Sequence, residues 1–150
     1  MDSRIDSIGE CAFCEIISGR SPSIKVFEDE EAFAFLDKSP VFKGHTLFVP
    51  KEHYANLYDM EDASMAKFFS NLKIVAKGVE LGTESDGTLI IENNNVSQSV
   101  PHLHFHIVPR KFGDGLRGFL WPRMRYKSIE EEEALAKSIR NHIERLLHEH

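Results

Sequence analysis

Three histidines alternate with apolar residues in the run His102-Leu103-His104-Phe105-His106. Alternation with period 2 is typical of a β-strand, so the imidazoles share one face and the apolar side chains share the other. A neutral imidazole is a nucleophile, a metal ligand and a proton carrier near neutral pH. Three histidines on one face would repel one another when protonated, and burying them unpaired would be costly. The run therefore indicates a strand that carries a chemical site.

The middle histidine of the three is the natural nucleophile, because it has a neighbour on each side. Attack on phosphorus suits a histidine, since the N–P bond that forms is labile and water can break it. We therefore predict that His104 attacks and that His106 donates to a phosphate oxygen or to the leaving oxygen. Gln98 and Ser99 lie just upstream, where amide and hydroxyl donors reach the same phosphate.

The chain has two cysteines, Cys11 and Cys14, in a C-x-x-C spacing. In a cytosolic protein this spacing indicates metal or redox chemistry rather than a structural disulfide. Two thiolates and two histidines make a tetrahedral zinc site, and the candidates are His45, His53 and one of the three alternating histidines. Free cysteines and a redox pair are the alternatives, although a redox pair normally follows a strand in a thioredoxin-like unit, which the sequence lacks.

Composition predicts one globular domain. The 150 residues are 41% hydrophobic and 28% charged, with a formal net charge of −6. Apolar runs are short and the first ten residues are polar, so we expect no membrane span, no secretory signal and a cytoplasmic location. The negative charge argues against general nucleic-acid binding. The stretch from Arg110 to Lys127 is basic, as for an anion-binding segment or a solvated loop.

Periodicity and turn signals predict the elements that must position these side chains. After a loose leader at 1–9, we expect helices at 11–18, 61–81 and 128–148 and strands at 24–28, 32–37, 46–50, 88–91 and 103–108. Ser128 and Glu131 form a capping box, and the helix that follows has an apolar stripe of Leu135, Ile139, Ile143 and Leu146 or Leu147. This order predicts an α+β fold: an antiparallel meander sheet with one long central helix and a C-terminal helix, in a single domain over 1–150.

The run from His102 to Val108 matches the His-φ-His-φ-His-φ-φ signature of the histidine triad (HIT) superfamily of nucleotide hydrolases and transferases, where φ is apolar. Three further segments resemble this family. Residues 11–17 resemble its opening segment, residues 34–53 resemble its central block, and residues 97–100 resemble the segment that precedes the triad. The resemblance covers residues 11–110. It implies the α+β HIT fold, usually as a homodimer whose sheets join across the interface.

The resemblance also implies two-step chemistry. His104 attacks the α-phosphate of a nucleotide to give a nucleotidyl-histidine intermediate, and water then releases a mononucleotide. His106 holds phosphate oxygens, and Gln98 or Ser99 assists the leaving group. Transferase and phosphorylase branches tend to carry glutamine at the position of His106, so histidine there favours hydrolysis.

The family pattern assigns two further sets of residues by resemblance. The first binds a purine nucleotide: Asp37 for the ribose hydroxyls, Phe13, Ile16 and Phe35 beside the base, and Asn93 for phosphate or sugar. Ile16 fits a plain core position equally well. The second set matches the zinc ligands of some members: Cys11, Cys14, His53 and His102. Such a Zn²⁺ is structural, because four protein ligands leave no position for water. No organic cofactor is implied.

Several functions remain open at this point. The favoured one is a phosphoramidase or dinucleoside polyphosphate hydrolase that releases AMP or another mononucleotide. The alternatives are a nucleotide-binding or scaffold protein with little turnover, a nucleotidyl transferase or phosphorylase, and a zinc- or redox-sensing module on Cys11 and Cys14. The leaving group is not revealed, because all these substrates present the same adenylyl half.

Overall fold

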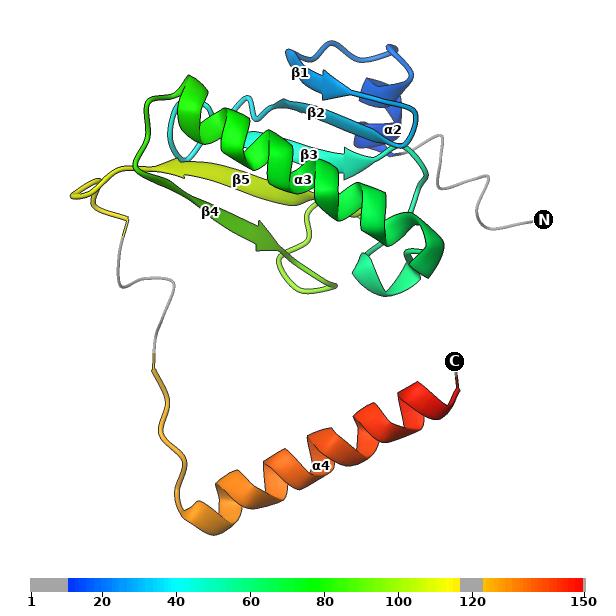
Figure 1. The fold of residues 1–150 in the computed structure, drawn as a ribbon, viewed down its shortest axis with the longest axis vertical. Helices are drawn as coiled ribbons and strands as arrows, with labels where there is room; N and C mark the ends of the chain where they lie inside the picture. Colours follow the sequence, from blue (N-terminus) through cyan, green and yellow to red (C-terminus); the bar gives the residue numbers. More distant parts are fainter. Residues whose placement is uncertain (1–10, 117–122, 150) are drawn as a thin grey trace. The chain divides into compact units, whose positions relative to one another are not determined.

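The structure, a computed structural model, describes residues 11–116 and 123–149. These residues fall into two compact units, one ending at Asp114 and the other beginning at Gly115 (Figure 1). The predicted leader at 1–9 lies outside the described residues, and the single domain over 1–150 stays a prediction. Within the described part of the chain, none of the helices is long and apolar enough to cross a bilayer.

Among its described residues, the first unit holds a five-stranded sheet and two α-helices. The helices are α2 (Ala12–Ile17) and α3 (Asp62–Gly82), with a 3-10 turn η1 (Leu57–Asp59) between them in sequence. The strands are β1 (Lys25–Glu28), β2 (Ala32–Leu36), β3 (Thr46–Pro50), β4 (Gly87–Glu92) and β5 (Phe105–Arg110). The second unit holds α4 (Ile129–His148), which begins at the predicted capping box: the Glu131 N–H donates to Oγ of Ser128 at 3.1 Å.

All neighbouring strands of the sheet are antiparallel, in the order β1-β2-β3-β5-β4. The first three strands form the predicted meander. The chain then runs through α3, places β4 at the edge and inserts β5 between β4 and β3. The predicted α+β class is therefore confirmed, and the insertion puts the histidine strand near the middle of the sheet rather than at an edge.

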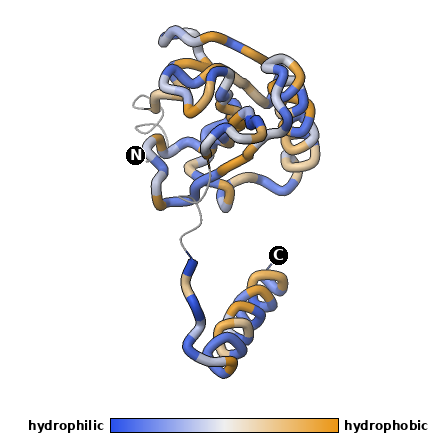
Figure 2. Tube along the Cα trace, turned by 90° about the vertical axis from the view of Figure 1, so that its left-hand side faces the viewer, coloured by the Kyte–Doolittle hydropathy of each residue, from blue (hydrophilic) through white to orange (hydrophobic). Residues whose placement is uncertain are grey.

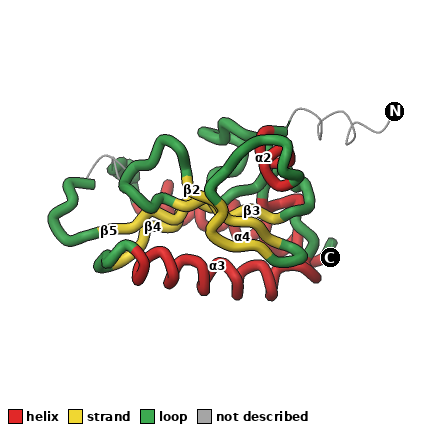
Figure 3. Tube along the Cα trace, turned by 90° about the horizontal axis from the view of Figure 1, so that it is seen from above, coloured by secondary structure: helices red, strands yellow, loops and turns green. Residues whose placement is uncertain are grey.

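Both faces of the sheet are covered, α3 lying along one and α2 along the other (Figure 3). Along β2, Ala32 and Ala34 pack into the α3 core, while Phe33 and Phe35 pack into the core beside α2. Because both faces are buried, the central strands are apolar at nearly every position. Leu103, Phe105 and Ile107 lie in the α3 core, so the predicted division between apolar and imidazole faces is confirmed. The imidazoles are thereby placed on the α2 face.

The histidine strand begins later than predicted, at residue 105 rather than 103. Its ladder with β3 ends at Phe105, opposite Phe48. Past this pair, β3 ends in Pro50, which has no N–H to donate to a neighbouring strand. The Leu103 N–H donates to the carbonyl of Tyr54 at 2.7 Å and not to β3. His102 and His104 therefore lie on a turn ahead of the strand, and only His106 lies within it.

The loop from β2 to β3 approaches the end of α3 at Gly44. This residue has a φ of +102°, and an added Cβ would clash with Cγ2 of Thr83. An L side chain is strained at this φ even with free space around it. Glycine is therefore required at the position that leads directly into His45.

We predict that Gly44→Ala lowers the free energy of unfolding by about 1–3 kcal/mol, through the positive φ and the clash together. Adding Thr83→Ser removes the clashing methyl group and should recover part of the loss. Gly78→Ala is the control, because a Cβ at this helical position meets nothing within 4 Å. It should stabilise the chain by about 0.5–1 kcal/mol. Urea unfolding measures all three, and an unchanged Gly44→Ala variant would contradict the argument.

Candidate functional site

Four side chains from separate segments form a cluster with the spacing of a tetrahedral metal site: Cys11, Cys14, His53 and His102. The Sγ atoms of Cys11 and Cys14 lie 3.4 and 3.5 Å from Nδ1 of His102. Nδ1 of His53 lies 3.1 Å from the same atom and 3.4 Å from Sγ of Cys14. Tetrahedral zinc with two sulfur and two nitrogen ligands has edges of about 3.3–3.8 Å, shortest between the nitrogens and longest between the sulfurs. The donor atoms therefore fit a metal ion of this kind.

The chemistry of these donors also calls for a cation. Nε2 of His102 donates its proton to the carbonyl of Pro50 at 2.8 Å, which leaves the Nδ1 lone pair aimed at the cluster. Burial and the neighbouring Cys11 raise the pKa of the Cys14 thiol to about 12. A thiolate at Cys14 thus requires a positive ion beside it.

The start of α2 brings the two cysteines together. Cys11 is the N-cap of the helix, and its Sγ accepts the Cys14 N–H at 3.3 Å. One turn of helix places residues three apart on the same side, so the C-x-x-C spacing delivers both sulfur atoms to one point. Phe13, which lies between the two cysteines in sequence, also faces inward. It packs edge-on against the ring of His104, with centroids 4.9 Å apart.

His104 is held in one tautomer by the turn that precedes β5. Its Nδ1–H donates to the carbonyl of His102 at 2.7 Å, so the lone pair is on Nε2. The side chain is buried, and burial lowers its pKa, against a smaller opposing effect of that carbonyl and of Asp37. His104 is therefore a neutral imidazole with one nucleophilic nitrogen at neutral pH.

His106 receives a hydrogen bond from a second histidine, His45. The Val41 N–H donates to Nδ1 of His45 at 3.1 Å, which places the His45 proton on Nε2. That proton is donated to Nδ1 of His106, 3.0 Å away, so His106 carries its own proton on Nε2. The His104 and His106 rings lie 5.0 Å apart. The pair therefore presents one acceptor nitrogen and one N–H donor side by side.

Burial, helped by the neighbouring His104 and His45 and opposed by Asp37, lowers the pKa of His106 to about 4. The pKa of His45 is also lowered by burial, with Asp37 opposing. The carboxylate of Asp37 lies 3.7 Å from Nε2 of His45 and also accepts the Ser39 N–H at 2.9 Å. Asp37 therefore lies at the edge of the histidine group, where sequence resemblance put a ribose contact.

The sequence predicts His45 only as a candidate metal ligand, and the structure places it outside the cluster that contains Cys11 and Cys14. The signal that would have found it is alternation along β3. Residue 45 precedes the strand on the same side as Leu47, and Leu47 pairs directly with His106. A histidine two positions from that partner falls beside the histidine face.

The other predicted phosphate contacts, Asn93, Gln98 and Ser99, lie on the loop between β4 and β5. The side-chain amide of Gln98 donates to the carbonyl of Ala55 and accepts the Asn95 N–H at 3.0 Å, so it ties this loop to Ala55. Ser99 is exposed and Asn93 is half-buried. The structure brings none of these three into hydrogen-bond contact with His104 or His106, within the described residues. Their roles stay predictions.

The predicted base contacts belong to the core on the α2 face. Phe13 and Phe35 are buried there with ring centroids 5.6 Å apart. Ile16 is half-buried and packs against the same core. The two rings thus form a fixed apolar wall beside His104, and Ile16 is the member of the three with surface still exposed.

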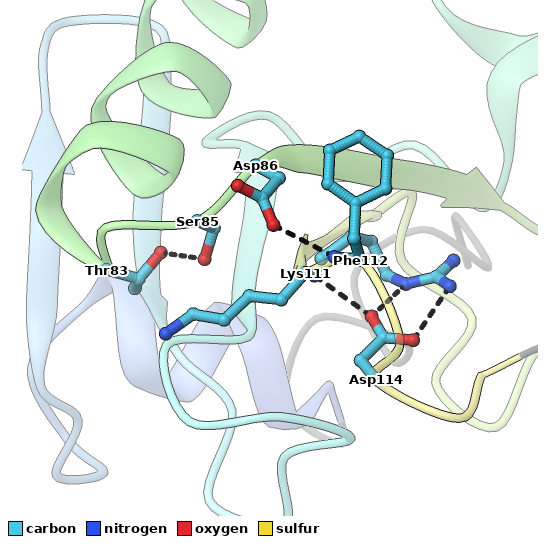
Figure 4. Close-up of polar contacts among 7 residues, drawn as sticks. Thr83, Ser85, Asp86, Lys111, Phe112 and Asp114 are labelled. Atoms are coloured by element: carbon cyan, nitrogen blue, oxygen red, sulfur yellow. Dashed lines mark hydrogen bonds and ion pairs between the residues drawn. The ribbon is translucent and has the colours of Figure 1, made fainter.

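Part of the predicted basic stretch lies at a cavity beside the C-terminal end of α3, where Figure 4 shows Lys111 together with Thr83 and Ser85. This cavity of about 630 Å³ is lined by three segments, with Lys43, Thr83, Ser85 and Lys111 among its residues. Arg110 binds the carboxylate of Asp114 through two hydrogen bonds of 2.6 and 3.0 Å. Its guanidinium is therefore engaged within the first unit. Residues 117–122 of the stretch lie outside the described residues.

Comparison with known proteins places this geometry in a family. The family model described as the HIT domain matches residues 18–113. A relative named adenosine 5'-monophosphoramidase hnt1, from Schizosaccharomyces pombe, is 37% identical over 133 residues, which cover 89% of this chain and 98% of the relative.

Two crystal structures are similar as well. The structure of SMU.412c from Streptococcus mutans UA159 has a TM-score of 0.80 at 38% identity, covering 89% of this chain and 85% of the other. A zinc-bound histidine triad family protein from Mycobacterium smegmatis has a TM-score of 0.68 at 32% identity, covering 93% and 99%. Since the family model spans well over half of the 150 residues and the triad lies within the match, this chain belongs to the HIT family.

Proposed function

We propose that this protein is a nucleotide hydrolase that cleaves at the α-phosphate through a nucleotidyl intermediate on His104. One observation carries the proposal: the His102 carbonyl holds the Nδ1–H of His104, so the Nε2 lone pair faces the site beside the N–H of His106. Relatives named adenosine 5'-monophosphoramidase, at 37% and 36% identity, support the same reaction class.

In the first step the Nε2 lone pair of His104 bonds to the α-phosphorus, and the bond from phosphorus to the leaving group breaks. The leaving group departs with the bonding electron pair and takes up a proton. The Nε2–H of His106 donates to a non-bridging phosphate oxygen, where negative charge builds up in the transition state. In the second step water attacks phosphorus and releases to solvent the proton that balances the one taken up by the leaving group; the N–P bond breaks, and its electron pair returns to His104 as the mononucleotide leaves.

The substrate residues follow from the same arrangement. We propose that Asp37 binds the ribose hydroxyls and that a purine base packs on Ile16 against the wall of Phe13 and Phe35. Ser99, with an exposed hydroxyl, is the donor to the leaving group in this proposal. Gln98 holds the loop through its bonds to Ala55 and Asn95, and Asn93 approaches phosphate or sugar.

We further propose that the Cys11, Cys14, His53 and His102 cluster holds a structural Zn²⁺. The ligand edges and the zinc-bound relative from Mycobacterium smegmatis support this choice. Zinc bound there would neutralise the two thiolates and stabilise the fold. The proposal also includes a homodimer in the cytoplasm, as resemblance and composition imply, with no organic cofactor.

We predict that His104→Ala lowers turnover by about 10³-fold or more while the fold is retained, because no other group supplies the nucleophile. The assay offers an adenosine phosphoramidate, diadenosine tri- and tetraphosphate and a sugar nucleotide, and resolves AMP by chromatography. His45→Gln, which disturbs the tautomer of His106 but leaves Nε2 of His104 in place, should lose less. Turnover that survives in His104→Ala would contradict the proposal. Tight mononucleotide binding without hydrolysis of any substrate would favour a binding protein.

We predict one zinc per chain by elemental analysis, lost in His53→Ala together with part of the thermal stability, because a ligand of the cluster is removed. His45→Ala is the matched control: it removes a histidine near the same sheet face but outside the cluster, and it should keep its zinc. Equal zinc in both variants would refute the assigned ligand set, and zinc in neither variant nor the wild type would refute the metal.

We predict that His106 contributes to the free energy of unfolding at neutral pH and that this contribution is lost in acid. The ordinary pKa of histidine is 6.5, and in the folded chain burial lowers that of His106 to about 4. The unfolded chain therefore binds the extra proton first, so this contribution is complete above pH 6.5 and is lost as the pH falls toward 4. His106→Gln should flatten the pH dependence of the urea midpoint within this window. His148→Gln, exposed on α4, should leave the slope unchanged, and an equal effect of the two would contradict the assignment.

A further inference from the structure

A cavity of about 630 Å³ in the first unit takes no part in the proposed reaction. The other surface without an assigned role is the apolar stripe of α4, whose residues recur along an otherwise polar helix (Figure 2), and nothing in the second unit shows what covers them. The volume of the cavity lies within the range of about 300–1,000 Å³ in which proteins bind small molecules. The side chains that line it therefore indicate what kind of molecule it holds.

Three segments that lie far apart in the sequence form the walls of the cavity. They are the loop between β2 and β3, the residues that follow α3, and the end of β5 with the turn after it. Gly44 packs directly on the other two walls: an added Cβ there would clash with Thr83 and would lie 3.6 Å from Cγ of Pro109. This close packing fixes the three segments against one another, so the cavity is preformed, as small-molecule sites usually are.

Two lysines from separate walls line the cavity. Lys43 belongs to the loop between β2 and β3, and Lys111 belongs to the turn after β5. Figure 4 shows the Lys111 side chain extending to the side on which Thr83 and Ser85 lie. Among the described residues, neither ammonium group forms an ion pair with a carboxylate. Both positive charges are therefore available to a bound anion.

The lining of the cavity carries a net positive charge. Asp114 is the acidic residue of this lining, and Arg110 neutralises its carboxylate through hydrogen bonds of 2.6 and 3.0 Å. Glu84 and Asp86 lie on the segment after α3 but do not line the cavity. Two ammonium groups are thus gathered at one hollow of a chain whose formal net charge is −6. A hollow lined by charges of one sign concentrates ligands of the opposite sign, so this cavity favours an anion.

A pair of hydroxyl groups adds a neutral donor to the two lysines. The hydroxyl oxygens of Thr83 and Ser85 lie 2.7 Å apart, and the Thr83 hydroxyl also donates to the Val79 carbonyl at 2.6 Å. Because this carbonyl already accepts the Thr83 N–H at 3.0 Å, the Thr83 hydroxyl can turn to Ser85 and leave the Ser85 proton for a ligand. The carbonyls of Glu80 and Leu81 also accept backbone N–H groups, so few unpaired carbonyls of the α3 terminus oppose an anion.

The remaining walls are apolar and suit the carbon part of a ligand. Phe42 is half-buried and Pro109 is buried, and both line the cavity. A bare inorganic anion would leave this apolar surface and most of the volume without a partner. Two ammonium groups and a hydroxyl offer donors for the three terminal oxygens of a phosphate monoester, whereas a carboxylate has two. The lining therefore matches an organic phosphate better than a carboxylate.

The cavity is separate from the histidine group. Ile107 packs into the α3 core, and alternate residues of a strand share a face. Pro109 therefore points to the α3 side of the sheet, whereas His106 lies on the α2 face. A ligand in the cavity and a nucleotide at His104 thus occupy different places.

We propose that this cavity is a second binding site, which takes a phosphorylated small molecule. The phosphate lies between the ammonium groups of Lys43 and Lys111 and accepts the hydroxyl proton of Ser85. The organic part of the ligand packs against Phe42 and Pro109. This site does not depend on the hydrolase chemistry, because none of its residues belongs to the histidine group or to the cysteine cluster.

Titration of the full chain with phenyl phosphate, followed by NMR at the backbone N–H of Gly44, tests the site. Lys43→Gln and Lys111→Gln are each expected to raise the dissociation constant read at Gly44 about tenfold at low salt. Lys73→Gln is the matched control, because it removes the same charge from an exposed position of α3 outside the cavity. It should leave the constant unchanged. If both cavity variants bind like the wild type, or if no shift occurs at Gly44, the proposal is overturned.

His104→Ala separates this test from that of the hydrolase. Phenyl phosphate that also binds at the triad shifts the N–H signals there, and the variant alters that binding. The dissociation constant read at Gly44 should stay the same, whether or not the wild type hydrolyses nucleotides. A loss of the Gly44 shifts in this variant would mean that the signal comes from the triad, and it would refute a second site.

Two further probes, inorganic phosphate and benzoate, test the class of ligand. Phenyl phosphate should bind more tightly than either, and Phe42→Ala should weaken the binding of phenyl phosphate but not that of inorganic phosphate. Benzoate binding as tight as that of phenyl phosphate would refute the choice of phosphate. Inorganic phosphate binding as tight as that of phenyl phosphate would refute a role for the apolar wall.

Discussion

The hydrogen bond from Nδ1–H of His104 to the carbonyl of His102 is the contact on which the site depends. The two residues belong to different groups of side chains. The ring of His102 lies in the Cys₂His₂ cluster and is fixed by the Pro50 carbonyl on its far side. Its backbone carbonyl then fixes the tautomer of the next histidine in the triad. Any disorder in the cluster would therefore reach His104 directly, through His102 alone.

A sheet covered on both faces makes this arrangement possible in a small unit. The α3 face takes the larger apolar core, in which Phe48 and Phe68 pack with centroids 4.7 Å apart. The α2 face can then devote its buried positions to imidazoles, with Phe13 and Phe35 excluding water around them. That exclusion keeps the histidines neutral, since an imidazolium is disfavoured where water cannot solvate it.

Much of this was predictable from local patterns. Period-2 alternation identified the histidine face, and the helix signals around α3 and α4 set their ends within about two residues. The start of β5 was wrong because it depends on a missing N–H at Pro50, far away in sequence. The role of His45 was missed because it follows from strand register, and the engagement of Gln98 was missed because its partners lie on another loop. Each failure concerns a long-range contact, which single-sequence patterns do not contain.

The hydrogen bonds of the three histidines decide which nitrogen keeps a free lone pair for the proposed reaction. Nδ1 of His45 is occupied by the Val41 N–H, and Nδ1 of His106 is occupied by the proton of His45. Neither nitrogen can take a proton or a phosphorus atom without first losing a hydrogen bond. His104 already uses its N–H on a carbonyl, and in the described part of the chain no such bond occupies its Nε2. Basicity and nucleophilicity are therefore concentrated on one atom, and a second attack site within the group is disfavoured by the same bonds that orient the first.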